Sequence, residues 1–200
     1  MKKTLLVVLM GFILIPLLPG GVKPGDKAVP FTLLNVDGTT VSLSDYQNQK
    51  GVILIFTSNT CPFTKAYEER MIQLHNKYAG TGYPLVTINS NNPQISPDDS
   101  YEHMKKRAME MNYPFPYLKD EKQEICEAYG ASRTPQVYLL QKSDVGFKVA
   151  YMGAIDDNSL DPRSVANRYL EKAIRALSEG EKPDPTSTRA IGCAIKKEDS

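Results

Sequence analysis

Alternating apolar and polar positions predict a mixed arrangement of strands and helices in the first half of the chain. Phe31–Val36 and Thr39–Leu43, separated by two turn residues, predict a β-hairpin. The continuous apolar run Val52–Phe56 is typical of a strand buried on both faces inside a parallel sheet. Apolar residues then recur at helical spacing over residues 63–79, and Pro84–Asn89 predicts a second core strand. This order favours an α/β domain.

The second half of the chain predicts three helices and a further strand pair. The expected helices cover residues 98–111, 123–129 and 161–178, and the expected strands cover residues 136–140 and 147–152. Asp98 or Asp99 is the expected N-cap of the first of these helices. The remaining residues, 179–200, are polar and contain prolines, which indicates an extended and flexible tail.

The N-terminus has the features of an export signal. Met1-Lys2-Lys3 supplies positive charge, and the apolar run of 14 residues from Leu5 to Leu18 is shorter than the roughly 20 residues that span a bilayer. We therefore expect residues 1–21 to be a signal peptide or an uncleaved anchor. Residues 22–179 would form one domain, and residues 180–200 a tail. The domain is expected outside the cytoplasm, in the periplasm or an equivalent space.

Composition excludes some partners and identifies few titratable candidates. The formal net charge is +1 over 200 residues, with acids and bases interspersed, so the chain has no electrostatic signature of nucleic-acid binding. No nucleotide-binding glycine loop or other cofactor signature occurs, and we expect no cofactor. The chain has three cysteines, so at least one has no partner within the chain.

Cys61 is the strongest candidate for chemistry. It follows the buried strand Val52–Phe56 and precedes Pro62, which suits the first position of a helix. A helix N-terminus stabilises an anion. A free cysteine is only about 3% ionised at pH 7, and this stabilisation raises the fraction to tens of per cent. The sequence thus predicts a nucleophilic thiolate; the alternative is an inert, buried cysteine.

Several short segments resemble the thioredoxin and peroxiredoxin superfamily. Thr60-Cys61-Pro62-Phe63-Thr64 looks like its active-site turn, and Thr134-Pro135 looks like the cis-proline loop that faces the cysteine. Residues 153–158 and 191–196 are similar to segments of exported peroxiredoxin-like redoxins related to AhpC/TSA proteins. The resemblance implies a thioredoxin-like fold, with a central mixed β-sheet flanked by helices, an N-terminal β-hairpin and an extended C-terminal tail.

Departures from the superfamily pattern bear on the mechanism. Dithiol reductases of the superfamily have a second cysteine at the position of Thr64, whereas peroxiredoxins have threonine or serine there. Ser58 occupies the position three residues before the nucleophile where peroxiredoxins have a hydroxyl side chain. A peroxidase also needs a cation near its thiolate. Arg133 is the first candidate and Lys65 the second, although both are also compatible with exposed surface charges. Lys65 further occupies the position where a copper-delivery relative has cysteine, so no metal site is expected.

Cys193 is a candidate resolving thiol. It lies between two small residues of the tail, and a segment of about ten residues reaches ~20 Å or more, enough to approach Cys61. Alternatively, a Cys126–Cys193 disulfide would fix the tail, although Cys126 more simply fits a half-buried helix residue.

Two functional classes follow from these features. The first is an exported thiol-dependent oxidoreductase, in which Cys61 attacks a hydroperoxide or a disulfide. Its partners would be a thiol reductant or a client protein held by a transient disulfide. The second is a non-catalytic thioredoxin-like module that binds client proteins. An accessible thiolate with a lowered pKa distinguishes the enzyme from the binding module.

Overall fold

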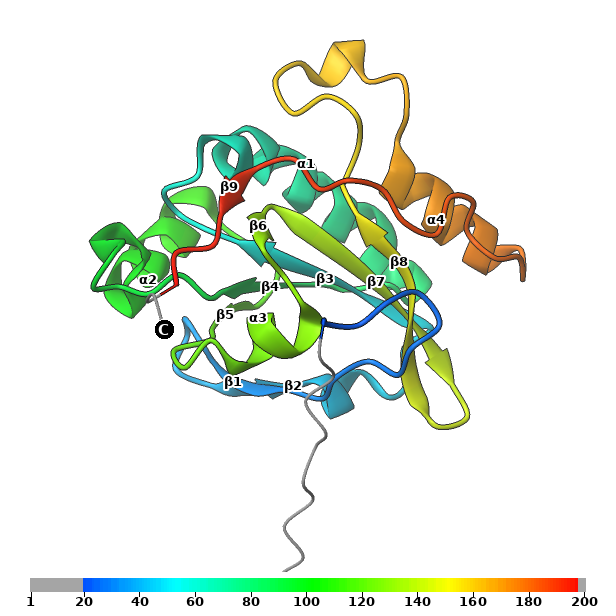
Figure 1. Ribbon diagram of the computed structural model, residues 1–200, viewed down its shortest axis with the longest axis horizontal. Helices are drawn as coiled ribbons and strands as arrows, with labels where there is room; N and C mark the ends of the chain where they lie inside the picture. Colours follow the sequence, from blue (N-terminus) through cyan, green and yellow to red (C-terminus); the bar gives the residue numbers. More distant parts are fainter. Residues whose placement is uncertain (1–19, 198–200) are drawn as a thin grey trace, which may run out of the picture.

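The computed structural model describes residues 20–197 as a mixed seven-stranded sheet flanked by helices (Figure 1). The sheet has the order β2-β1-β5-β4-β3-β7-β8, and a separate two-stranded sheet pairs β6 with β9. The strands are β1 (Thr32–Asn35), β2 (Thr40–Ser42), β3 (Gly51–Thr57), β4 (Leu85–Asn89), β5 (Tyr117–Lys119), β6 (Arg133–Thr134), β7 (Gln136–Ser143), β8 (Gly146–Gly153) and β9 (Cys193–Ala194). The α-helices are α1 (Pro62–Tyr78), α2 (Tyr101–Met111), α3 (Glu124–Tyr129) and α4 (Tyr169–Ser178).

Strand directions confirm the predicted mixed sheet and N-terminal hairpin. β3, β4 and β5 run parallel, whereas β1 pairs with β2, β3 with β7, and β7 with β8 in antiparallel register. Because the carboxyl ends of β3, β4 and β5 share one edge of the sheet, the loops after them are brought together. The predicted export signal lies almost wholly outside the described residues.

The buried strand β3 supplies side chains to both layers of the core. Leu54 and its neighbours two residues away face one side, which α3 and the N-terminal segment cover. Ile53 and Ile55 face the other side, where they pack with residues of α1 and α4. All residues of β3 are buried, as the apolar run predicts. This strand fixes the position of the loop that follows it.

The helix predicted over residues 98–111 begins later than expected. A 3₁₀ turn, Pro97–Asp99, precedes α2, and Ser100 is the N-cap of α2. The prediction that Asp98 or Asp99 caps this helix is therefore wrong. Asp99 is fully buried, and its carboxylate accepts hydrogen bonds from Asn59, 40 residues away in the sequence, and from Asn89 at the end of β4.

The closing helix is also shorter than predicted. α4 begins at Tyr169 rather than Asp161. Asp161 instead caps a 3₁₀ turn at Pro162–Ser164, and the Asp157 carboxylate accepts hydrogen bonds from the backbone N–H groups of Ala166 and Asn167. These side-chain acceptors satisfy N–H groups that a helix would otherwise use, so the segment stays irregular.

The C-terminal tail is extended, as predicted, and it packs along the domain rather than hanging free (Figure 1). The backbone of Met152 exchanges hydrogen bonds with Thr186 and Thr188. Gly153 has a positive φ, and a Cβ there would lie 2.3 Å from the Thr188 hydroxyl oxygen. Glycine thus allows the tail to approach the end of β8 closely before it reaches β9.

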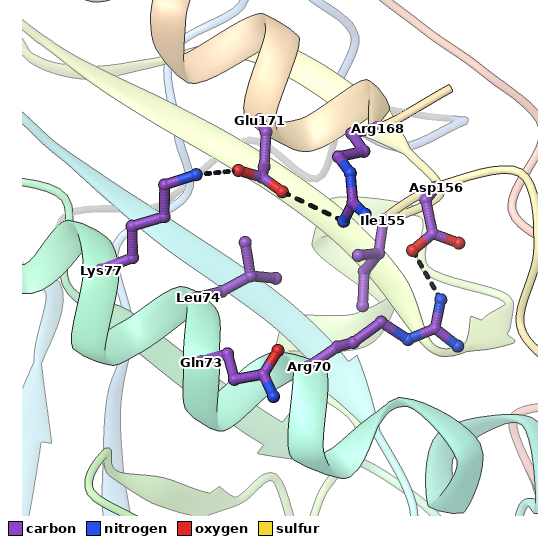
Figure 2. A pocket seen from close by; sticks show the side chains of 8 residues that line it. All are labelled: Arg70, Gln73, Leu74, Lys77, Ile155, Asp156, Arg168 and Glu171. Carbon is purple, nitrogen blue, oxygen red and sulfur yellow. Dashed lines mark hydrogen bonds and ion pairs between the residues drawn. The ribbon is translucent and has the colours of Figure 1, made fainter. Parts of the chain in front are cut away.

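A buried ion pair ties the segment after β8 to α1 (Figure 2). Arg70 Nη1 lies 2.6 Å from Asp156 Oδ2 and donates to the carbonyl of Asn158 at 2.7 Å. Tyr67 donates from its hydroxyl to Asp156 Oδ1 at 2.7 Å. Both charged side chains are buried, so each depends on the other for compensation.

Arg70→Leu is expected to lower the free energy of unfolding by about 3–5 kcal/mol, because it leaves the Asp156 carboxylate buried without its cation. Urea denaturation followed by circular dichroism measures this change. Lys77→Ala is the matched control, since Lys77 of α1 forms a more exposed pair with Glu171 of α4 and its loss should cost less than about 1 kcal/mol. Equal losses of unfolding free energy in the two variants would contradict the expectation that the buried ion pair contributes more than the exposed one.

Candidate active site

Cys61 lies where the sequence predicts, between β3 and α1. It is the N-cap residue of α1 with extended backbone, and Pro62 occupies the first helical position. Its side chain is buried, with the residue only 2% exposed. The thiol is therefore close to free N–H groups at the helix start but is covered by neighbouring segments.

The cis-proline loop covers the thiol from one side. The Thr134–Pro135 peptide bond is cis, and Cys61 Sγ donates to the carbonyl oxygen of Thr134 at 3.0 Å. β6, which contains Thr134, precedes this bond directly. Cys61, Thr134 and Pro135 are thus brought together from segments more than 70 residues apart.

β9 covers the same site and carries Cys193. Cys193 pairs opposite Thr134, and Ala194 opposite Arg133, in an antiparallel register. A Cβ on the preceding Gly192 would lie 2.0 Å from the carbonyl oxygen of Thr134, so only glycine allows this approach. The tail therefore places the second predicted thiol beside the first. All three cysteines are free thiols in this structure.

The two adjacent thiols have opposite tendencies to ionise. Burial raises the pKa of Cys61, but the Cys193 thiol and the N–H groups of Thr64 and Cys193 outweigh it, so the pKa lies below its ordinary value. Burial and the hydrogen bond to Cys61 raise the pKa of Cys193 to about 11. Chemically, the pair can hold a thiolate at Cys61 next to a protonated thiol at Cys193.

Hydroxyl groups complete the immediate surroundings of Cys61. Ser58 Oγ accepts from the backbone N–H groups of Thr60 at 3.1 Å and Cys61 at 3.3 Å, so it shapes the loop. The Thr64 hydroxyl oxygen is buried and has no hydrogen-bond partner within residues 20–197. It is thus free to donate to an additional oxygen atom in the site.

The two candidate cations lie at the surface. Arg133 and Lys65 are both exposed, and neither contributes to the lowered pKa of Cys61. The charge of Arg133 acts on Cys193, where it opposes the larger effect of burial on the pKa. In this arrangement hydrogen bonds, rather than a buried cation, lower the pKa of Cys61.

Cys126 does not belong to the site. It is fully buried in the core beside Tyr129 and Ile195, and burial raises its pKa to about 11. Its thiol donates to the carbonyl of Gln123 at 3.2 Å. The Cys126–Cys193 disulfide considered as an alternative is not formed.

Two cavities lie beside α1, and neither is lined by Cys61 or Cys193. A small cavity of about 40 Å³ lies beside Pro135, between Tyr67 and Ile191 of the tail. Another cavity, of about 170 Å³ between α1 and α4, is lined by charged side chains together with Gln73, Leu74 and Ile155, and it does not include Cys61 (Figure 2). Over residues 20–197, no group of three or more potential metal ligands is close together, and no helix is long and apolar enough to cross a membrane.

Sequence reasoning missed Asp99 and Asn91, which hold the loops around the two thiols. Asp99 was assigned to a helix cap, whereas its carboxylate accepts from the N–H of Asn59 at 2.6 Å and from the side chain of Asn91 at 2.8 Å. The sequence held one signal for these residues, namely their position after two core strands. Asn91 follows β4 and Ser58 follows the parallel strand β3, so both loops lie at the same edge of the sheet.

Comparison with known proteins identifies a family and several named relatives. The AhpC/TSA family model matches residues 24–148, more than half of the chain. The thiol-disulfide oxidoreductase ResA of Geobacillus thermodenitrificans is 26% identical over 122 residues, which cover 61% of this chain and 66% of ResA. Peroxiredoxin Q of wheat, Triticum aestivum, is 30% identical, with 63% of this chain and 58% of that protein covered.

Solved structures agree with the thioredoxin-like fold. An uncharacterized conserved protein from Geobacillus kaustophilus is 38% identical with a TM-score of 0.81, over 88% of this chain and 93% of that one. The pneumococcal exposed lipoprotein thioredoxin Etrx1 of Streptococcus pneumoniae is 25% identical with a TM-score of 0.54, over 66% of this chain and 93% of that one. The fold predicted from the sequence is confirmed.

Cys193→Ala is expected to raise the pKa of Cys61, because it removes the thiol that donates to the Cys61 thiolate while burial remains. Cys193→Ser keeps a donor at this position and should keep the pKa lower than in the alanine variant. The rate of iodoacetamide alkylation at Cys61 against pH measures both, with peptide mass mapping to locate the label. Identical profiles for the two variants would contradict the hydrogen bond.

Proposed function

Since this chain belongs to the AhpC/TSA family, we propose that it is a thiol-dependent oxidoreductase whose Cys61 and Cys193 cycle between dithiol and disulfide. The observation that best supports this proposal is the pairing of β9 with β6, which brings Cys193 next to Cys61. The pKa of Cys61 is lowered and that of Cys193 is raised. Cys61 is the nucleophile in this scheme, and Cys193 is the resolving thiol.

A small hydroperoxide is the oxidant that the geometry favours. Cys61 is almost fully covered by β9 and the cis-proline loop, so a compact molecule reaches its sulfur more readily than a folded protein does. The Cys61 thiolate would attack one peroxide oxygen and break the O–O bond; the alkoxide leaves and takes a proton to become an alcohol, or water from hydrogen peroxide. Cys61 is then a sulfenic acid, with Thr64 supplying a free hydroxyl nearby.

Cys193 would complete the oxidation. Its sulfur attacks the Cys61 sulfenic acid, the S–S bond forms, and the hydroxyl leaves as water with the thiol proton. An external thiol reductant then restores both thiols by disulfide exchange. The raised pKa of Cys193 fits this order, because Cys193 stays protonated while Cys61 reacts first.

A disulfide in a client protein is the second candidate oxidant. The exposed position of Arg133 supports it, because a peroxidase without a cation at its thiolate lacks one source of activation. Cys61 would attack the client disulfide, and Cys193 would then release the reduced client. Both oxidants give the same Cys61–Cys193 disulfide.

For the whole protein, we propose export by the N-terminal leader, with residues 22–179 as the redox domain and the tail as the carrier of Cys193. Activity outside the cytoplasm suits a protein that uses a disulfide as its resting oxidised form.

Reduced protein mixed with one equivalent of hydrogen peroxide is expected to form a Cys61–Cys193 disulfide in a single turnover. Cys61→Ser should abolish this oxidation, because it removes the nucleophile. Cys193→Ser should still oxidise at Cys61 but stop at a sulfenic acid that dimedone traps. Stopped-flow kinetics with peptide mass mapping measures each step, and Cys126→Ala serves as the control that leaves both steps unchanged.

The results separate the candidate functions. Slow reaction with peroxide but fast disulfide formation with a model disulfide would shift the assignment to thiol–disulfide exchange. Turnover that persists in Cys61→Ser, or Cys61 reactivity no greater than that of a free thiol with both oxidants, would instead favour the non-catalytic binding module.

A further inference from the structure

One buried carboxylate, that of Asp99, contacts the loops that hold both thiols. Asp99 is fully buried at the edge of the sheet where β3, β4 and β5 end. Seven hydrogen-bonding groups surround it or its main chain. Its two carboxylate oxygens accept from the Ser58, Thr60 and Ser96 hydroxyls, the Asn59 N–H and the Asn89 and Asn91 side chains, while Lys119 donates to its carbonyl.

The first set of contacts fixes the loop before Cys61. Asp99 Oδ1 accepts from the Asn59 N–H at 2.6 Å, and Oδ2 accepts from the Thr60 hydroxyl at 2.9 Å and the Ser58 hydroxyl at 3.1 Å. Because the Ser58 hydroxyl proton points to Asp99, its oxygen is left to accept from the Cys61 N–H. The orientation of this loop therefore depends on the carboxylate.

The second set of contacts reaches the tail through Asn91. Its Nδ2 group donates to Asp99 Oδ2 at 2.8 Å, so its Oδ1 atom is turned toward the tail and accepts from the Lys196 N–H at 2.8 Å. The Asn92 N–H donates to the Lys196 carbonyl at 2.9 Å. Lys196 follows β9 by two residues, so these bonds hold the strand that carries Cys193.

Only an ionised carboxylate accepts at every one of these positions. It has no proton to donate, so each surrounding hydroxyl and amide must point its proton inward. Burial raises the pKa of Asp99, but hydrogen bonds from Asn91, Ser96, Asn89 and Thr60 outweigh it and keep the pKa below its ordinary value. An asparagine side chain at this position would place its NH₂ group, a donor, against groups that are themselves donors, so several of these hydrogen bonds would be lost.

We propose that Asp99 is a positioning residue that aligns Cys193 with Cys61 for formation of the disulfide. It touches neither sulfur; it acts through Ser58 on one thiol and through Asn91 and Lys196 on the other. This inference rests on the proposed function, since it concerns the second step of that reaction.

Asp99→Asn is expected to slow the closure of the Cys61–Cys193 disulfide by about 10- to 100-fold, because small displacements of reacting atoms cost rates of this order. The first oxidation of Cys61 should slow less than this closure does, because only the closure requires both thiols to be aligned. Single-turnover oxidation with hydrogen peroxide in the presence of dimedone measures the partition of the sulfenic acid between dimedone and Cys193. A general loss of stability does not by itself change this partition in the folded protein.

Asp120→Asn is the matched control. Asp120 is also buried at this edge of the sheet, but its carboxylate accepts from Ser90 and from the N–H of Cys126, away from both thiols. It should leave the dimedone partition at the wild-type value. An equal change in Asp120→Asn, or wild-type closure in Asp99→Asn, would overturn the positioning role.

If circular dichroism shows that Asp99→Asn does not fold, Asn91→Ala tests the positioning role instead. It removes the contact with Lys196 together with the Asn91 donor to Asp99 and Ser58, and it leaves the Asp99 contacts to Ser58, Asn59 and Thr60. Slower closure with unchanged first oxidation supports the proposal, and unchanged closure overturns it. Failure of the proposed function is a separate result: the wild-type protein would then form no Cys61–Cys193 disulfide with either oxidant.

Discussion

The pairing of β9 with β6 is the contact on which the site depends. It brings residues near the end of the chain onto the cis-proline loop, and it closes over a thiol that is otherwise only a helix N-cap. Gly192 allows the close approach, and Ile195 is buried in the core just beyond Cys193. The tail is thus held on both sides of the cysteine, which keeps the second thiol near the first without a covalent bond.

This contact also divides the chemistry between the two thiols. A helix N-terminus alone favours an anion at Cys61, yet burial of the same sulfur opposes it. The Cys193 thiol and backbone supply donors that outweigh burial, and the same hydrogen bond keeps Cys193 protonated. In the proposed cycle, the nucleophile is therefore both activated and shielded by its resolving partner. In that cycle, shielding would favour small oxidants, or larger ones that displace the tail.

Local patterns predicted the elements that depend on local physics. The apolar run of β3, the helix that starts at Pro62 and the paired thiol candidates were all evident in the sequence. Asp99 was misread because Ser96-Pro97-Asp98-Asp99-Ser100 has the composition of a helix start, which satisfies the local rule. Its actual partners come from residues about 40 positions earlier and from the loop after β4. No local pattern carries such contacts. The predicted start of the closing helix was wrong for the same reason, since the Asp157 carboxylate accepts from the N–H groups of Ala166 and Asn167.

Because α1 contains no cysteine after Cys61, the position of the second thiol depends on the register in which β9 pairs with β6. With Thr64 in place of that cysteine, the proposed resolving thiol comes from outside the helix, and its placement depends on strand pairing. Side chains alternate along a strand, so a shift of β9 by one residue would turn Cys193 away from Cys61. A two-residue strand specifies register weakly by itself. The buried Ile195 side chain and the polar contacts of Lys196 therefore supply the specificity that the short strand lacks.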